Sequence, residues 1–159
     1  EMEVHHDGEK GEECLTIPKG VEVYEIEGKT FFTFGGATSF DKHMREENIS
    51  WWMEEIFTKE EQLNAIQNLE RKGNNVDFVI THTAPRKFLT NSLEHLQGAD
   101  ACMVSEFLDE LSCKINYEKW YFGHFHDDHY FGHISEYDWN GDTIMLFNKV
   151  EEICTDDAV

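Results

Sequence analysis

The chain has 159 residues, 40% of them hydrophobic and 13% aromatic, which is enough to form one globular domain or most of one. Its 13 basic and 33 acidic residues give a formal net charge of −20, so neither nucleic acid nor an anionic membrane surface is an expected partner. The four cysteines show no paired spacing and predict reduced thiols. No apolar run approaches the roughly 20 residues of a membrane helix, and no signal-like segment opens the chain, so we expect a cytoplasmic location.

Composition divides the chain into three parts. Residues 1–14 are acidic and lack apolar periodicity, which predicts a loop or a frayed end. A single domain is predicted over 15–150, and residues 151–159 form an acidic tail. The chain begins with Glu1, which fits a processed product or a fragment of a longer protein.

The first half of the predicted domain contains a hairpin and a strand–helix–strand unit. Apolar and polar residues alternate over 21–26, and a turn at Gly28 leads into the apolar run 30–34, a pattern typical of a β-hairpin. Residues 58–72 open with a capping-box pattern and carry an apolar stripe, which predicts a helix. The nearly continuous apolar run 76–81 predicts a strand inside a sheet, covered on both faces.

The second half continues the same alternation of elements. Residues 100–113 have the apolar periodicity of an amphipathic helix, and 119–123 read as the next strand. Two further strands are predicted over 128–135 and 143–148, joined by a turn at Asn140-Gly141. The order of elements indicates an α/β fold.

Three histidines stand at the ends of two of these strands. His82 directly follows the run 76–81, and the run Gly123-His124-Phe125-His126 stands at the end of the strand predicted over 119–123. If the extended conformation persists, His124 and His126 point to the same side. Strand ends of α/β sheets are where such folds bind ligands, so these histidines predict a metal site.

The motifs around these histidines resemble those of the calcineurin-like metallophosphoesterases. GHFH follows an aromatic strand, TH-x-x-P follows an apolar strand, and GGA-x-S-x-DK-x-x-R lies upstream, followed by WW-x-x-E. The similarity covers roughly residues 21–150. It implies the carboxyl-terminal part of an α/β/β/α sandwich with mixed β-sheets, and a metal-dependent hydrolase of phosphoesters.

The resemblance also implies roles for particular residues. His82 and His124 would bind one metal ion, and His126 would bind a second. The family uses two divalent cations, roughly 3.5 to 4 Å apart, for in-line attack on phosphorus; manganese, iron, zinc and nickel are not distinguished by these residue types. Arg45 is a candidate contact for the substrate phosphate, with a surface ion pair to a neighbouring glutamate as the alternative, and Arg86 is placed to reach a phosphate.

The remaining ligands of the family come from D-x-H, GD-x-x-D and GNH motifs that precede this segment, and none of them precedes it here. The nearest strings are Val4-His5-His6-Asp7, which has the reverse order, and Asn140-Gly141-Asp142, which reads as a turn. The chain therefore lacks the bridging carboxylate and the catalytic asparagine–histidine pair, and no catalytic residue is assigned. We expect it to be inactive or weakly active alone, with the missing half supplied by an amino-terminal segment or another polypeptide.

Two alternatives remain open. In the first, the chain is a non-catalytic module of the same fold that binds a partner or forms a homodimer through an exposed sheet edge. In the second, the three histidines form an unrelated mononuclear site with open positions for water. His129 and His133 are candidates for supporting residues or for an adventitious site with the neighbouring aspartates. Trp51 and Trp52 are expected in a core or interface, with lining of the site as the alternative.

Overall fold

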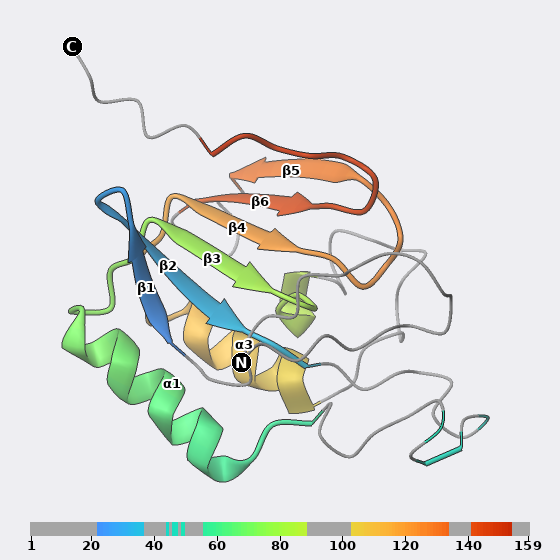
Figure 1. Ribbon diagram of the computed structural model, residues 1–159, viewed down its shortest axis with the longest axis horizontal. Helices are drawn as coiled ribbons and strands as arrows, with labels where there is room; N and C mark the ends of the chain where they lie inside the picture. The colour runs from blue at the N-terminus through green and yellow to red at the C-terminus, as the bar shows by residue number, and fades with distance from the viewer. Residues whose placement is uncertain are drawn as a thin grey trace.

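The structure is a computed structural model, and it describes residues 22–36, 44, 46–47, 49, 56–88, 103–133 and 141–153. These residues form a mixed α/β fold in which two helices lie against one face of a six-stranded sheet (Figure 1). The predicted α/β class is confirmed.

The first two strands form the predicted hairpin. Strand β1 (Val23–Ile26) pairs antiparallel with β2 (Lys29–Phe34). The two residues between them, Glu27 and Gly28, have φ angles of 50° and 78°. Positive φ at both central positions gives a turn whose twist matches that of the flanking strands, which is why glycine is favoured there.

Helix α1 (Lys59–Arg71) connects β2 to β3 (Phe78–Thr81), and the two strands pair in parallel, as the strand–helix–strand prediction requires. The capping box is also confirmed. The Thr58 hydroxyl accepts the Glu61 backbone N–H at 3.2 Å, and the Glu61 carboxylate accepts the Thr58 backbone N–H at 2.6 Å. These reciprocal bonds satisfy amide groups that would otherwise lack partners at the start of the helix.

The second half adds helix α3 (Met103–Ser112), β4 (Lys119–Phe122), β5 (His129–His133) and β6 (Asp142–Met145). Strand β4 pairs in parallel with both β3 and β6, and β5 pairs antiparallel with β6. The last two predicted strands therefore do form an antiparallel pair, although most of the connection between them lies outside the described residues.

The strand order is β1-β2-β3-β4-β6-β5. The four inner strands β2, β3, β4 and β6 are parallel, so their carboxyl ends lie at one edge of the sheet, where the arrows in Figure 1 point. In α/β folds the loops at this edge converge on the ligand-binding crevice. The topology therefore brings together the residues that follow β3, β4 and β6.

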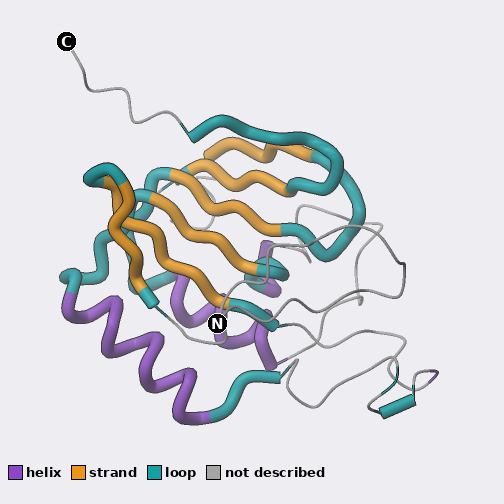
Figure 2. The backbone as a smooth tube through the Cα atoms, in the orientation of Figure 1, coloured by secondary structure: helices purple, strands orange, loops and turns teal. Residues whose placement is uncertain are grey.

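Helices α1 and α3 lie on one side of the sheet (Figure 2), and the main core lies between them and the sheet. Trp120 on β4 is 1% exposed, and Phe32 on β2 is fully buried. The helices contribute apolar residues that alternate with polar ones at helical spacing; the buried ones are Ala65, Leu69, Val104, Phe107, Leu108 and Leu111. No helix in the described part of the chain is long and apolar enough to cross a membrane.

A second, smaller cluster lies on the opposite face of the sheet. Phe78, Tyr121 and Ile144 come from three neighbouring parallel strands, and each is 4% to 5% exposed. Ile153, which follows β6 in sequence, packs against them. Both faces of β3 are thus covered, as its apolar sequence predicted.

A glycine before β6 has no space for a side chain. A Cβ atom at Gly141 would overlap the carbonyl oxygens of Tyr117 and Glu118, which are backbone atoms that cannot rotate away. Gly141→Ala should therefore lower the free energy of unfolding by about 3 kcal/mol, the upper end for over-packing. Urea denaturation followed by circular dichroism measures this difference.

Gly28→Ala is the matched control. Gly28 has a φ of 78°, but no atom lies within 4 Å of an added Cβ. The substitution costs only the strain of a left-handed alanine, about 1 kcal/mol. Equal effects of the two substitutions would contradict the packing explanation.

Candidate functional site

The backbone on either side of His82 is fixed by buried hydrogen bonds. His82 is the first residue after β3, and it is exposed while Thr81 and Thr83 are buried. The Thr81 hydroxyl accepts the Trp120 indole N–H at 2.8 Å and donates to the Thr83 carbonyl oxygen at 2.6 Å. The exposed imidazole therefore stands on a rigid support anchored in the core.

The chain that leaves β4 passes close to the chains that leave β3 and β6. The Gly123 N–H donates to the His82 carbonyl oxygen at 3.0 Å. A Cβ atom at Gly123 would lie 3.4 Å from the Leu146 carbonyl oxygen, at the near limit of ordinary van der Waals contact. The three backbone segments therefore meet at this residue.

His124 occupies a strained turn that brings its ring to His82. Its φ is 72°, and the Phe125 N–H donates to the Gly123 carbonyl oxygen at 2.9 Å, which together indicate a γ-turn centred on His124. Such a conformation costs roughly 1 to 3 kcal/mol for a residue other than glycine. The Nε2 atom of His82 and the Nδ1 atom of His124 lie 3.0 Å apart.

His126 does not form a three-residue group with this pair. Its φ is 53°, again in the left-handed region, and its ring stacks on Phe147 with centroids 4.9 Å apart and an interplanar angle of 21°. The expectation that His124 and His126 face the same side required an extended chain, and that condition is not met because the strand ends at Phe122. The structure thus brings His82 and His124 together, with His126 against a neighbouring loop.

Asp128 links the loop after β4 to the loop after β6. Its carboxylate accepts the backbone N–H groups of Phe147 at 2.7 Å, Asn148 at 3.1 Å and Lys149 at 3.1 Å. These bonds, the one from Phe147 foremost, hold the pKa of Asp128 below its usual value. They also explain why β6 ends at Met145 and not at residue 148 as predicted, since these amides bind a side chain in place of a neighbouring strand.

The spacing of the two paired nitrogens fits one metal ion. Imidazole nitrogens about 2.0 to 2.1 Å from a shared ion lie roughly 2.9 to 3.4 Å from each other, and the observed separation of His82 and His124 is 3.0 Å. The same distance fits a hydrogen bond between one protonated and one unprotonated nitrogen. Within the described ranges, no group of three or more histidine, cysteine, aspartate or glutamate side chains is arranged to hold a metal. Among the described residues, the pair thus offers two nitrogens at a spacing that one ion could bridge, without a third side chain of these types beside them.

The remaining candidate residues lie in other surroundings. Arg86 donates to the Glu106 carboxylate at 2.9 Å, so its guanidinium is engaged in an ion pair with α3. Cys113 is a free, exposed thiol. His129 and His133 lie on β5 and are exposed. The candidate residues outside the described part of the chain are Arg45, Cys14, Cys102, Cys154, Trp51, Trp52, His43 and His95.

Two strings with the order of a D-x-H motif were overlooked in the sequence. Asp41-Lys42-His43 and Asp127-Asp128-His129 both have the D-x-H order, although neither precedes the segment as in the resembled family. The first lies outside the described residues. The second contains Asp128, whose bonds to the loop after β6 could not be inferred from the residues next to it.

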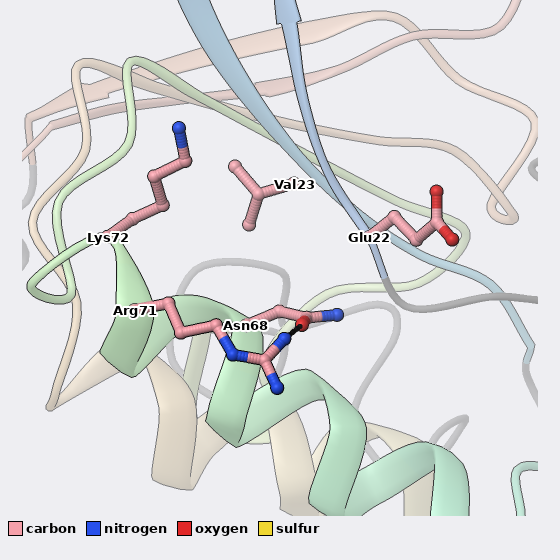
Figure 3. A pocket seen from close by; sticks show the side chains of 5 residues that line it. All are labelled: Glu22, Val23, Asn68, Arg71 and Lys72. Carbon is pink, nitrogen blue, oxygen red and sulfur yellow. Dashed lines mark hydrogen bonds between the residues drawn. The ribbon is translucent and has the colours of Figure 1, made fainter.

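An open groove of about 290 Å³ lies between β1 and α1 and was not anticipated from sequence (Figure 3). It is lined by Glu22, Val23, Asn68, Arg71 and Lys72. Arg71 donates to the Asn68 side-chain oxygen at 2.6 Å. These elements carry none of the predicted metal ligands, so the groove is separate from the histidine pair.

No protein-family model matches the chain, and no curated protein sequence matches it either. The likeness to metallophosphoesterases thus remains a prediction from the motifs.

The support beneath His82 can be tested through Thr81. Thr81→Val removes both hydrogen bonds of the hydroxyl and leaves the buried Trp120 N–H and Thr83 carbonyl without that partner. We expect a loss of about 1 to 3 kcal/mol in the free energy of unfolding, measured by urea denaturation.

Thr33→Val provides the control, because Thr33 is also buried on a strand but its hydroxyl has no hydrogen-bond partner among the described residues. Replacing an unpaired hydroxyl with a methyl group should be neutral or stabilising. A Thr81→Val variant as stable as Thr33→Val would contradict the role given to the Thr81 hydroxyl.

Proposed function

We propose that this chain is the carboxyl-terminal part of a calcineurin-like metallophosphoesterase, a divalent-metal-dependent hydrolase of phosphoesters. The observation that carries the proposal is the 3.0 Å contact between His82 and His124 at the carboxyl ends of two adjacent parallel strands. The motif resemblance assigns these two residues to one metal and His126 to another. The separate position of His126 is compatible with that division.

The fold supports the same proposal. In an α/β/β/α sandwich, each sheet has helices on one face and the other sheet on its second face. Here α1 and α3 cover one face, and the other carries the apolar cluster of Phe78, Tyr121 and Ile144, which is already buried within this chain. Under the proposal, the described sheet is one of the two, and the missing amino-terminal half contributes to the second.

His82 and His124 would hold a divalent metal ion through Nε2 and Nδ1, the atoms that face each other. When bound there, the ion would supply Lewis-acid polarisation of a phosphoryl oxygen. The protein's own contribution is positional. The Thr81 hydroxyl and the Gly123 backbone fix the two histidines before any ligand arrives, so little conformational entropy is lost on binding.

The substrate class follows from the proposed site together with the charge of the chain. At a net charge of −20, the protein repels polyanions, so a small phosphoester is favoured over nucleic acid. A metal ion reverses this field locally and allows a phosphate to approach. The contact from Arg45 remains part of the proposal, and the bridging carboxylate and catalytic pair would come from an amino-terminal segment or another polypeptide.

Metal titration tests the histidine pair. By isothermal calorimetry with Mn²⁺ and Zn²⁺, we expect the chain to bind at most one ion, weakly, because the ligand set is incomplete. His82→Ala and His124→Ala should each abolish this binding. His133→Ala is the control, since His133 is an exposed histidine on β5. Tight binding of two ions, or binding that is unaffected by either substitution at the pair, would refute the assignment.

Hydrolysis of a chromogenic phosphomonoester and phosphodiester tests the proposed reaction. The chain alone should turn over these esters slowly or not at all, and any turnover should require added Mn²⁺ and disappear in His124→Ala. The reason is that charge on phosphorus is stabilised by metal in this chemistry. Turnover without metal, or turnover that survives His124→Ala, would show that a different site or reaction is involved.

A further inference from the structure

We propose that Asp128 is a positioning residue for His126, acting through Phe147. This inference deepens the proposed function, on which its relevance to metal binding rests. The contacts form a short chain: the Asp128 carboxylate binds the backbone of the loop after β6, that loop presents the Phe147 ring, and the ring stacks on the His126 imidazole.

The first link is a carboxylate held by three consecutive amides. Asn148 donates to both carboxylate oxygens, at 3.2 and 3.1 Å, while Phe147 and Lys149 donate to one of them. Hydrogen bonds to an ionised acceptor are stronger than neutral ones. The partners are 19 to 21 residues apart in sequence, so the bonds tie together two loops that follow different strands.

The second link is the Phe147 ring, which lies at the surface and is not fixed by burial in the core. Phe147 is 52% exposed, in contrast to the core phenylalanines. The regular pairing of β6 with β4 ends just before it, where the Leu146 N–H donates to the Phe122 carbonyl oxygen at 2.9 Å. The direction of the chain at Phe147 is therefore set largely by its N–H bond to Asp128, the shortest of the set at 2.7 Å.

The third link orients the His126 imidazole. His126 is exposed, and its φ of 53° places it in a conformation that histidine adopts at a cost. Stacking at 4.9 Å and 21° lies within the range of favourable ring pairs. It restricts rotation of the imidazole, which is what a ligand histidine needs before its metal binds, because outer contacts of this kind orient metal ligands.

Asp127 provides a matched control in the same loop. It is the same residue type one position earlier, it is exposed, and its carboxylate accepts the Asp128 N–H at 2.8 Å. That bond stays within the loop and does not reach the chain after β6.

The experiment is proton–carbon NMR of the imidazole resonances in the metal-free chain, with His126 assigned from a His126→Gln variant. In the native chain, the stacked Phe147 ring should displace the His126 resonances upfield from those of exposed His133. We expect Asp128→Ala and Phe147→Leu to remove this displacement, and Asp128→Asn to reduce it, because the amide keeps one acceptor oxygen. The resonances of His82 and His124 should stay in place, and Asp127→Asn should move none.

An unchanged His126 resonance in Asp128→Ala, with circular dichroism showing a folded chain, would overturn the proposal. If Asp128→Ala does not fold, an unchanged His126 resonance in Asp128→Asn would overturn the proposal instead. Equal shifts in Asp127→Asn would also overturn it, since they would show a general effect of charge. Because no metal is added, loss of the stack tests positioning alone, whereas the calorimetric titration of the histidine pair tests the proposed function.

Discussion

The candidate site depends on the parallel register of β3 and β4. Thr81 lies opposite Phe122, and the pairing continues one residue further through the bond from the Gly123 N–H to the His82 carbonyl oxygen. A slip of one residue would turn every side chain of one strand to the other face of the sheet and separate the two histidines. The register is fixed by buried side chains such as Trp120, so the core determines the geometry of the exposed site.

The parts of the fold that sequence predicted well are those specified by neighbouring residues. The turn at Gly28, the capping box of Thr58 and Glu61, and the apolar run of β3 each involve residues within a few positions of one another. Such signals act before the chain has any tertiary structure, which is why the pattern alone was sufficient. The parallel pairing of β2 with β3 followed from the helix between them.

The details of the site depend on distant residues and could not be predicted in the same way. His124 turns toward His82, 42 residues away, in place of continuing the strand. His126 meets Phe147, and β6 ends early because Asp128 takes its next amides. The residue pattern placed the histidines at two strand ends and the motif resemblance paired His82 with His124, but the loop contact that sets His126 against Phe147 could not be inferred from either.

One carboxylate at this edge of the sheet has a structural task. Three backbone N–H dipoles stabilise the ionised form of Asp128. A carboxylate two residues from His126 thus serves to organise a loop.

The left-handed backbone conformation at His124 and His126 lowers the stability of the fold at the candidate site. Glycine adopts these angles without strain, so replacement of either histidine by glycine would relieve a local cost while removing a candidate ligand. Such substitutions belong to the class of changes that commonly stabilise a marginally stable protein. The price of the candidate site would thus be a local loss of stability at two positions of one loop.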